Sequence, residues 1–302
     1  MSQISRPSSR QSETSKAGVD DQNPMSFRSG RVPRSSDVFI AVMGVTGSGK
    51  SSFISTCSKE EVKIGHNLDA CTTAVDVYAY DISSSKTAFL IDTPGFDDTN
   101  RSDTEVLREI AKWLGASYKS KIKLHGIIYL HRITDIRMQG SAKKNFILFG
   151  QLCGEEPLKR VILVTTMWDK VPEEEGAKRE RELIETRDFW GWMVQKGSSC
   201  RRHNNTEDSA RDIVSFLSGH EDSITTDLQR QLVDENKSLD ETAAGIGLQS
   251  ELLKEKTKWA QEKKEIEEQM QVAIQEHNRE AEEIMREERD RYTRMLKKVE
   301  DG

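Results

Sequence analysis

The chain has 302 residues, of which 35% are hydrophobic and 32% charged, and its formal net charge is −6. A typical domain is roughly 45–50% apolar on a somewhat wider count, so part of this chain is expected to be a tail or a solvated helix. The charge balance excludes a general attraction to nucleic acid. No apolar run approaches the roughly 20 residues of a membrane-spanning helix.

Residues 1–36 are rich in serine, contain five arginines and hold almost nothing apolar. Such a segment cannot bury enough surface to offset the entropy lost on ordering. We expect a disordered, mildly basic arm that serves as an inert tail, with a phospholipid-binding or phosphorylated arm as the alternative. The arm lacks the apolar core of a secretory signal, and the four scattered cysteines form no C-x-x-C pair. We therefore expect a cytoplasmic protein, for which peripheral membrane association has no further support.

Short apolar runs alternate with amphipathic stretches between residues 37 and 220. The expected strands are Val38–Met43, Val75–Tyr80, Thr87–Ile91, Gly126–Leu130 and Arg160–Thr165. The expected helices are Lys50–Ser58, Asp103–Leu114, Gly140–Leu152, Pro172–Asp188 and Thr206–Leu217. Continuous apolar strands interleaved with helices predict an α/β domain whose largely parallel sheet is covered on both faces. Ligands of such sheets bind at the carboxyl ends of the strands.

Residues 221–302 form a third region, which is about half charged from residue 251 onward. Its apolar residues recur at three- and four-residue steps, which indicates a narrow stripe on a long helix, as in a coiled coil: Leu252, Trp259, Ile266, Met270, Ile274, Ala281, Ile284, Met295 and Val299. His277 and Glu288 interrupt the stripe. A single helix held by i,i+4 ion pairs is the alternative. We expect pairing within or between molecules, with a coiled-coil partner or a second copy, because an exposed apolar stripe invites one.

The most informative run extends from Gly44 to Ser51 and fits G-x-x-x-x-G-K-[ST] between an expected strand and an expected helix. Glycines let successive N–H groups turn inward and form an anion-binding nest, to which the helix adds the positive end of its dipole. Lys50 can reach the β- and γ-phosphates in a catalytic role, and Ser51 can ligate Mg²⁺. A glycine-rich turn that binds nothing is the alternative. The expected nucleotide contacts are Gly44, Val45, Thr46, Gly47, Ser48, Gly49, Lys50 and Ser51.

The run Asp92-Thr93-Pro94-Gly95 supplies the second half of a Mg²⁺-nucleotide site. Asp92 leaves an apolar strand and can hold the water shell of the metal, while the Gly95 N–H can meet a γ-phosphate. A threonine between the two motifs can reach Mg²⁺ when the γ-phosphate is present and release it after hydrolysis. Thr73 is the first choice for this metal and catalytic contact and Thr72 the second, with a strand-capping hydroxyl pair as the alternative.

The strand that ends at Thr166 is followed by Met167-Trp168-Asp169. Asp169 can accept hydrogen bonds from guanine N1–H and N2–H₂, a donor pair that adenine lacks. The usual GTPase form here is Asn/Thr-Lys-x-Asp, so Thr166 and Asp169 match, and Met167 can supply the apolar packing of the missing lysine. GTP and GDP are therefore favoured over ATP. We also expect a final base loop at Lys196–Ser199, with Ser198 as its contact.

The runs GVTGSGKSS, CTTAV and LIDTPGFDDTNRSDTEVLREI resemble the septin-related GTPases, especially the immunity-associated (GIMAP-type) family, over about residues 38–220. The chain is also similar to uncharacterised fungal G-domain proteins that carry TTMWD and a charged helical C-terminus. The resemblance implies a Ras-like α/β fold, GTP and GDP binding with Mg²⁺, and self-association through the G domain. It implies a phosphate contact at Ser52, metal contacts at Ser51, Thr73 and Asp92, and guanine recognition at Asp169.

GTP hydrolysis is expected to be slow. GTPases of the Ras type place a water-orienting glutamine just after D-x-x-G, whereas this chain has Phe96, a lack that the septin-related families share. A partner, such as a second G domain facing the nucleotide, would then complete the site. We expect a GTP-operated switch or self-assembling scaffold whose helical C-terminus carries the output. The alternatives are an ATP-dependent P-loop enzyme and a filament or interaction protein with structural nucleotide.

Overall fold

The computed structural model describes residues 33–58, 75–98, 100–136, 138, 140–220, 222–275 and 279–300. Most of the expected N-terminal arm, together with Thr72 and Thr73, lies outside these residues. Among the described residues, no helix combines the length and the apolar character that crossing a membrane requires.

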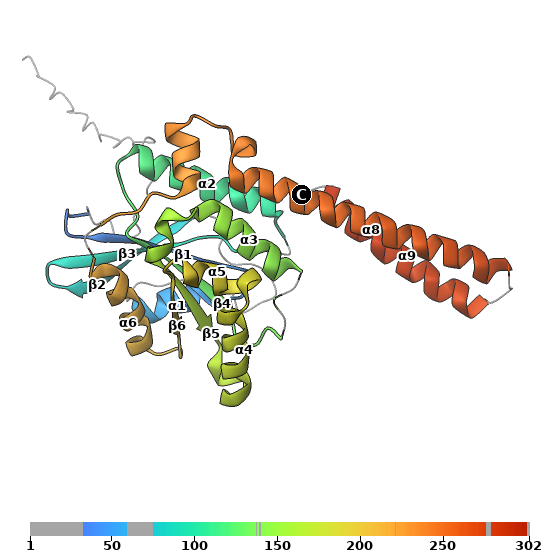
Figure 1. Ribbon diagram of the computed structural model, residues 1–302, viewed down its shortest axis with the longest axis horizontal. Helices are drawn as coiled ribbons and strands as arrows, with labels where there is room; N and C mark the ends of the chain where they lie inside the picture. The colour runs from blue at the N-terminus through green and yellow to red at the C-terminus, as the bar shows by residue number, and fades with distance from the viewer. Residues whose placement is uncertain are drawn as a thin grey trace, which may run out of the picture.

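A six-stranded sheet with the strand order β2-β3-β1-β4-β5-β6 forms the centre of the domain (Figure 1). Every neighbouring pair is parallel except β2 and β3, which are antiparallel. The strands are β1 (Val38–Gly44), β2 (Asp76–Ser83), β3 (Lys86–Asp92), β4 (Gly126–Arg132), β5 (Val161–Thr166) and β6 (Ser199–Arg202). The expected α/β fold with a mostly parallel sheet is therefore confirmed, with β6 as a strand that the sequence did not predict.

Helices cover both faces of the sheet, which is why the central strands are apolar along their whole length. On one face, α1 (Lys50–Cys57) and α6 (Glu207–Ser218) pack on alternate residues of β1 such as Ile40 and Val42. The other alternate residues, such as Ala41 and Met43, face a second helical layer. That layer consists of α2 (Asp103–Lys119), α3 (Ser141–Cys153), α4 (Glu173–Glu185) and α5 (Trp192–Gln195).

The first of two long C-terminal helices begins on the same core. These helices are α8 (Ala243–Gln275) and α9 (Arg279–Glu300). They follow α7 (Asp227–Gln229) and several short helical turns, at Glu156–Arg160, Trp168–Lys170, Arg187–Gly191, Arg230–Asp234 and Leu239–Glu241. Leu228, Ala244 and Leu248 are buried with the α2–α3 layer. A Cβ on Gly247 would lie 1.7 Å from the Gln151 Oε1 atom of α3, so α8 starts in very close contact with α3. The core thus includes residues after 220, and a domain division at that point stays a prediction.

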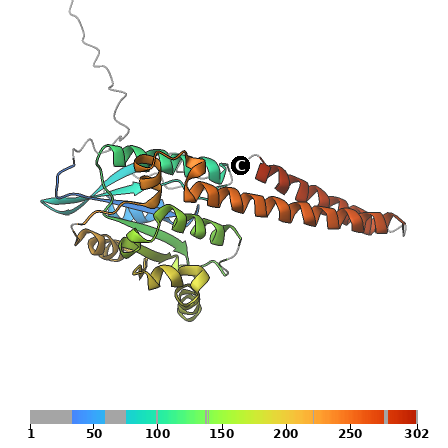
Figure 2. The same cartoon turned by 45° about the horizontal axis from the view of Figure 1, so that its top comes forward.

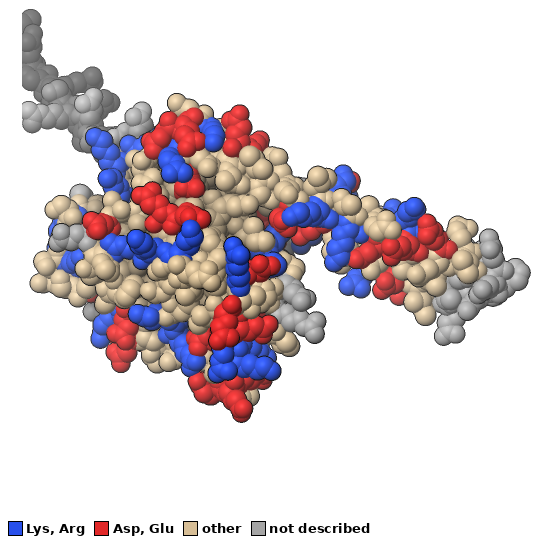
Figure 3. All heavy atoms as spheres, in the orientation of Figure 1, with Lys and Arg blue, Asp and Glu red and all other residues tan. Residues whose placement is uncertain are grey.

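Beyond this contact, α8 and α9 project from the domain as an antiparallel pair (Figures 1 and 2). The rings of Trp259 and Tyr292 have centroids 5.9 Å apart, and Lys256 forms an ion pair with Glu300 at 2.9 Å. Charged residues of both signs lie on the surface of this helical pair (Figure 3). Trp259 of the expected stripe therefore contacts the second helix of the same chain, whereas another expected member, Ile284, is exposed, and a coiled-coil partner stays a prediction.

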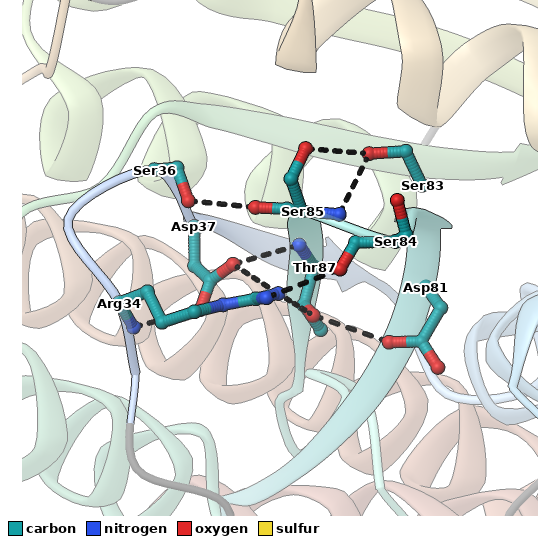
Figure 4. Close-up of polar contacts among 8 residues, drawn as sticks. All are labelled: Arg34, Ser36, Asp37, Asp81, Ser83, Ser84, Ser85 and Thr87. Carbon is teal, nitrogen blue, oxygen red and sulfur yellow. Dashed lines mark hydrogen bonds and ion pairs between the residues drawn. The ribbon is translucent and has the colours of Figure 1, made fainter.

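A buried carboxylate fixes the start of β1 against the β2–β3 hairpin (Figure 4). Asp37 accepts hydrogen bonds from the backbone N–H of Arg34 at 2.7 Å, from the Arg34 guanidinium at 3.1 Å and from the Thr87 N–H at 2.8 Å. Thr87 in turn donates to Asp81 at 3.1 Å. Burial raises the pKa of Asp37, but the hydrogen bonds from Arg34 and Thr87 outweigh it and hold the pKa below its ordinary value.

We predict that Asp37→Ala lowers the free energy of unfolding by roughly 2–4 kcal/mol at pH 7, because the Thr87 N–H and the Arg34 guanidinium lose their acceptor. The folded-state pKa of Asp37 lies below its ordinary value of 3.8, so this stabilisation is present above that value and is lost as the pH falls through the folded-state pKa. Urea unfolding of both proteins between pH 7 and about pH 3 measures the difference. The exposed Asp212→Ala is the control, and a wild-type-to-variant gap that does not shrink in acid would contradict the assignment.

Candidate functional site

The loop from Gly44 to Ser51 joins the carboxyl end of β1 to the first turn of α1. Gly44, Gly47 and Gly49 have φ values of 142°, 76° and 93°, a region that L-residues with side chains rarely adopt. A Cβ on Gly44 would also lie 2.4 Å from the Leu130 carbonyl oxygen of β4. The glycines thus allow the loop to turn at the sheet edge, where the N-terminus of α1 favours an anion.

Lys50 places a buried positive charge inside this loop. Its Nζ donates to the carbonyl oxygens of Gly44 at 3.0 Å and Val45 at 3.1 Å. Burial lowers the pKa of Lys50 to about 8, with Arg132 acting in the same direction and the charges of Asp92 and Asp98 opposing it. The ammonium is therefore largely protonated at neutral pH, and a phosphate beside it would be a favourable counter-charge.

Ser51 and Asp92 form the pair expected at a metal ion. The Ser51 hydroxyl donates to Asp92 Oδ2 at 3.0 Å, and Asp92 is buried at the end of β3. Within the described residues, no three His, Cys, Asp or Glu side chains gather as a metal cage. A single carboxylate and a hydroxyl nevertheless fit Mg²⁺, which retains waters and takes further oxygen ligands from substrate phosphates.

The Asp92–Gly95 turn leads directly onto the phosphate loop. The Thr46 N–H donates to the Phe96 carbonyl at 2.8 Å, and the Thr46 hydroxyl donates to the Gly95 carbonyl at 3.2 Å. A Cβ on Gly95 would lie 2.6 Å from Lys50 Nζ and 2.6 Å from the Thr46 nitrogen, so only glycine allows this approach. The Phe96 side chain is buried in the core and supplies no group that could orient water.

Two further strand ends support the loop. The Thr166 hydroxyl at the end of β5 donates to the Ser48 carbonyl at 2.9 Å, so Thr166 braces the loop, and its role at the base stays a prediction. The Arg132 guanidinium at the end of β4 lies 3.3 Å from the Cβ position of Gly47 and pairs with Asp135 at 3.0 Å. Arg132 is a residue of this site that was not predicted from the sequence, although its place at the carboxyl end of a strand is a signal for it.

Three more residues were predicted to contact the nucleotide, namely Ser48, Ser52 and Asp169. The Ser48 hydroxyl is buried and has no hydrogen-bond partner in the described part of the chain, so a polar ligand could satisfy it. Ser52 lies in the first turn of α1, and its carbonyl accepts from the Thr56 hydroxyl at 2.8 Å. Asp169 is exposed on the Trp168–Lys170 turn that follows β5, and Met167, the residue before this turn, has a φ of 63°.

Ser198 does not lie at this edge of the sheet. Its hydroxyl is buried and donates to the Leu158 carbonyl at 2.8 Å, and the next residue, Ser199, pairs with Ile162 at the start of β5. Ser198 therefore sits at the amino-terminal ends of β5 and β6, opposite the phosphate loop, which corrects its assignment to a base loop. The segment at the carboxyl end of β6, on the side of the phosphate loop, is His203–Asn205. The His203 ring is buried, and its centroid lies 5.0 Å from that of the Phe53 ring of α1.

Residues 39–166 match the sequence model of a family described as 50S ribosome-binding GTPase. The match extends from β1 to the end of β5 and includes both phosphate-side motifs. No curated protein sequence matches the chain.

The fold is similar to that of Toc33 from Arabidopsis thaliana in complex with GDP and Mg²⁺, with a TM-score of 0.51 and 16% identity over 64% of this chain and 88% of that chain. A second structure, described as showing that dimerization is important for the GTPase activity of the chloroplast translocon components atToc33 and psToc159, gives a TM-score of 0.51 and 16% identity over 63% and 87%. At this identity the likeness establishes the fold alone. The family match and the loop geometry support a GTP-binding P-loop GTPase domain with a Ras-like fold, whereas the immunity-associated family stays a prediction.

Proposed function

We propose that this chain is a slow GTPase that acts as a nucleotide-operated switch or self-assembling scaffold. The observation that carries the proposal is the direct contact between the phosphate loop and the Gly95–Phe96 segment, made by Thr46 and Lys50. A γ-phosphate bound between these segments would bias the position of the residues after Gly95, because its charge must be met by Lys50 and by nearby N–H groups.

Several of this chain's groups would hold the nucleotide and its metal. The loop N–H groups and Lys50 would contact the phosphates, and Ser51 and Asp92 would bind Mg²⁺ directly or through water, with Thr73 as a further ligand. Mg²⁺ supplies charge neutralisation at the phosphates. Asp169 would select guanine, with the His203–Asn205 segment beside it in place of Ser198. ATP is the alternative nucleotide, for which we see no adenine signature.

Hydrolysis is proposed to depend on a second G domain. Phe96 is buried and cannot orient water, so the position just after Gly95 does not supply the water-orienting group of a fast GTPase. Dimerization is described as important for the GTPase activity of the structurally similar chloroplast translocon components atToc33 and psToc159. A second copy that faces the nucleotide edge would complete the site, and a filament with structural nucleotide is the alternative in which turnover matters little.

The C-terminal helical pair is proposed to carry the output, through a chain of polar contacts that starts just after Gly95. Asp97 donates its N–H to Asp103 Oδ1 at 3.0 Å and accepts from the Ser141 hydroxyl at 2.8 Å. The other oxygen of Asp103 pairs with Lys144 at 2.8 Å, and Lys144 also meets Glu255 of α8 at 3.5 Å. Each contact can respond to a shift of the preceding one.

Lys144 is the centre of this chain of contacts. Its side chain is only 9% exposed. Burial lowers the pKa of Lys144, but Asp103 and then Glu255 outweigh that effect and raise the pKa above its ordinary value. The buried ammonium therefore stays charged at neutral pH and requires both carboxylates, which couples α2 to α8.

We predict that the purified protein binds GDP and GTP in preference to ATP at millimolar Mg²⁺, and that Lys50→Ala weakens binding by at least about 100-fold, since a charge-assisted contact of roughly 3 kcal/mol is lost. Titration with fluorescent nucleotides measures both effects. Lys178→Ala, an exposed lysine on α4, is the control that should bind as the wild type does. A wild-type protein that takes up no guanosine nucleotide would overturn the proposal.

If a second G domain completes the site, GTP turnover per molecule rises with protein concentration and levels off once dimers predominate. Phosphate release measured over a hundredfold range of concentration tests this expectation. The same series on a chain truncated after residue 257, which keeps the part of α8 packed on the core, separates the G domain from the helical pair. Turnover per molecule that stays constant in both proteins argues against the dimer.

If Lys144 transmits the nucleotide state, hydrogen exchange in α8 differs between the GDP form and a form bound to a non-hydrolysable GTP analogue. Lys144→Met keeps the side-chain volume but removes the charge, and we expect it to abolish that difference while nucleotide affinity stays within about twofold. Lys143→Met is the matched control, because Lys143 pairs with the exposed Asp188 at 3.2 Å. Equal nucleotide-dependent exchange in both variants would show that α8 is not coupled through Lys144.

A further inference from the structure

A closed ring of polar contacts joins the ends of β5 and β6 to α4. The Trp168 indole N–H donates to the Thr165 hydroxyl at 3.0 Å, and that hydroxyl donates to Glu180 Oε1 at 3.3 Å. The other oxygen of Glu180 accepts from Arg202 Nε at 2.8 Å. The Arg202 guanidinium completes the ring by stacking on Trp168, with its Cζ 3.9 Å from the ring centroid.

Helix α4 is fitted closely to this ring. A Cβ on Gly176 would lie 2.6 Å from the Trp168 ring, so the helix backbone approaches the indole as only glycine allows. Arg202 donates to Glu173 of the same helix at 2.7 Å. Arg179 donates to the carbonyl oxygens of Ile133 at 2.8 Å and Thr134 at 3.0 Å, just beyond β4. The helix therefore holds the loops after three neighbouring strands in one arrangement.

The aromatic member and the cationic member of the ring each adjoin a proposed base-binding segment. Trp168 directly precedes Asp169, and Arg202 directly precedes the His203–Asn205 segment. Asp169 itself is exposed and lies on a turn of three residues, so its own contacts do little to fix its carboxylate. A carboxylate that accepts hydrogen bonds from two N–H groups of a base must be held within about 0.5 Å of its binding position, and its neighbours must supply that restraint.

We propose that the Trp168–Arg202 stack, closed by Thr165 and Glu180, is a positioning element that determines guanine selectivity through Asp169. Neither Trp168 nor Arg202 is among the residues assigned to the phosphates or the metal, and both adjoin the segments assigned to the base. The inference rests on the proposed function, because it requires Asp169 to read the base. It assigns a role to Arg202 and Trp168 that a surface salt bridge or a packed tryptophan would not have.

Inosine diphosphate isolates this role, because it lacks only the 2-amino group of GDP. Loss of one charge-assisted hydrogen bond to a carboxylate changes affinity about 10–100-fold, so the wild type is expected to prefer GDP over inosine diphosphate by that factor. Asp169→Asn should bring the preference close to one. Arg202→Met should lower it at least about fivefold while the affinity for inosine diphosphate stays within about twofold.

Two variants distinguish the stack from charge alone and from a general loss of structure. Arg202→Lys keeps the positive charge beside Glu180 but loses the planar stack, and we expect it to reduce the preference as Arg202→Met does. Arg201→Met is the matched control, since Arg201 lies over the Phe216 ring of α6 at 5.0 Å and should leave the preference unchanged.

The outcomes separate the two proposals. If the wild type binds neither nucleotide, or binds both equally, the assignment of Asp169 fails and the positioning role fails with it. If Asp169→Asn abolishes the preference but Arg202→Met and Arg202→Lys retain it, the proposed function stands and the positioning role alone is overturned. Equal weakening of GDP and inosine diphosphate by the Arg202 variants would also overturn it, because that result indicates a structural role.

Discussion

Backbone segments from four strands approach one another closely at the carboxyl ends of the sheet, and this approach forms the candidate site. The phosphate loop contacts the ends of β3, β4 and β5 at once. Gly44 lies against the Leu130 carbonyl, Gly95 lies against Lys50, and Thr166 holds the Ser48 carbonyl from the far side. Any side chain at the two glycines would separate these segments, so the site exists only while the backbones touch.

The buried ammonium of Lys50 can attract an anion, but its burial costs desolvation free energy. The loop carbonyls accept from the ammonium, and Asp92 and Asp98 offset part of the desolvation that lowers its pKa. A bound phosphate would complete the balance, which is how such a site gains affinity for an anion without a large excess of positive charge. The net charge of −6 shows that this recognition is local and does not arise from the overall field of the protein.

Outside the phosphate contacts, polar side chains that are partly buried link distant elements. Lys144 joins the start of α2 to α8, and Glu180 joins β5, β6 and α4. Such contacts are directional and lose much of their energy when one partner moves, so they suit elements that must respond to a neighbour or hold it in register. Apolar packing, as at Leu248 on the α3 layer, fixes where α8 starts but is less sensitive to small shifts.

Short runs of sequence encode the phosphate loop, the Asp92–Gly95 turn, five of the strands and the α/β class, because the spacing within each run reflects local backbone geometry. Features that depend on residues far apart in the chain emerge only in the folded protein. The fold revealed β6, a short polar edge strand with no apolar pattern in the sequence, and its pairing places Ser198 at the end of the sheet opposite the phosphate loop. It also brought Arg202 onto Trp168 and Trp259 of α8 against Tyr292 of α9, because stacking and helix pairing follow from three-dimensional proximity that spacing along a chain does not specify.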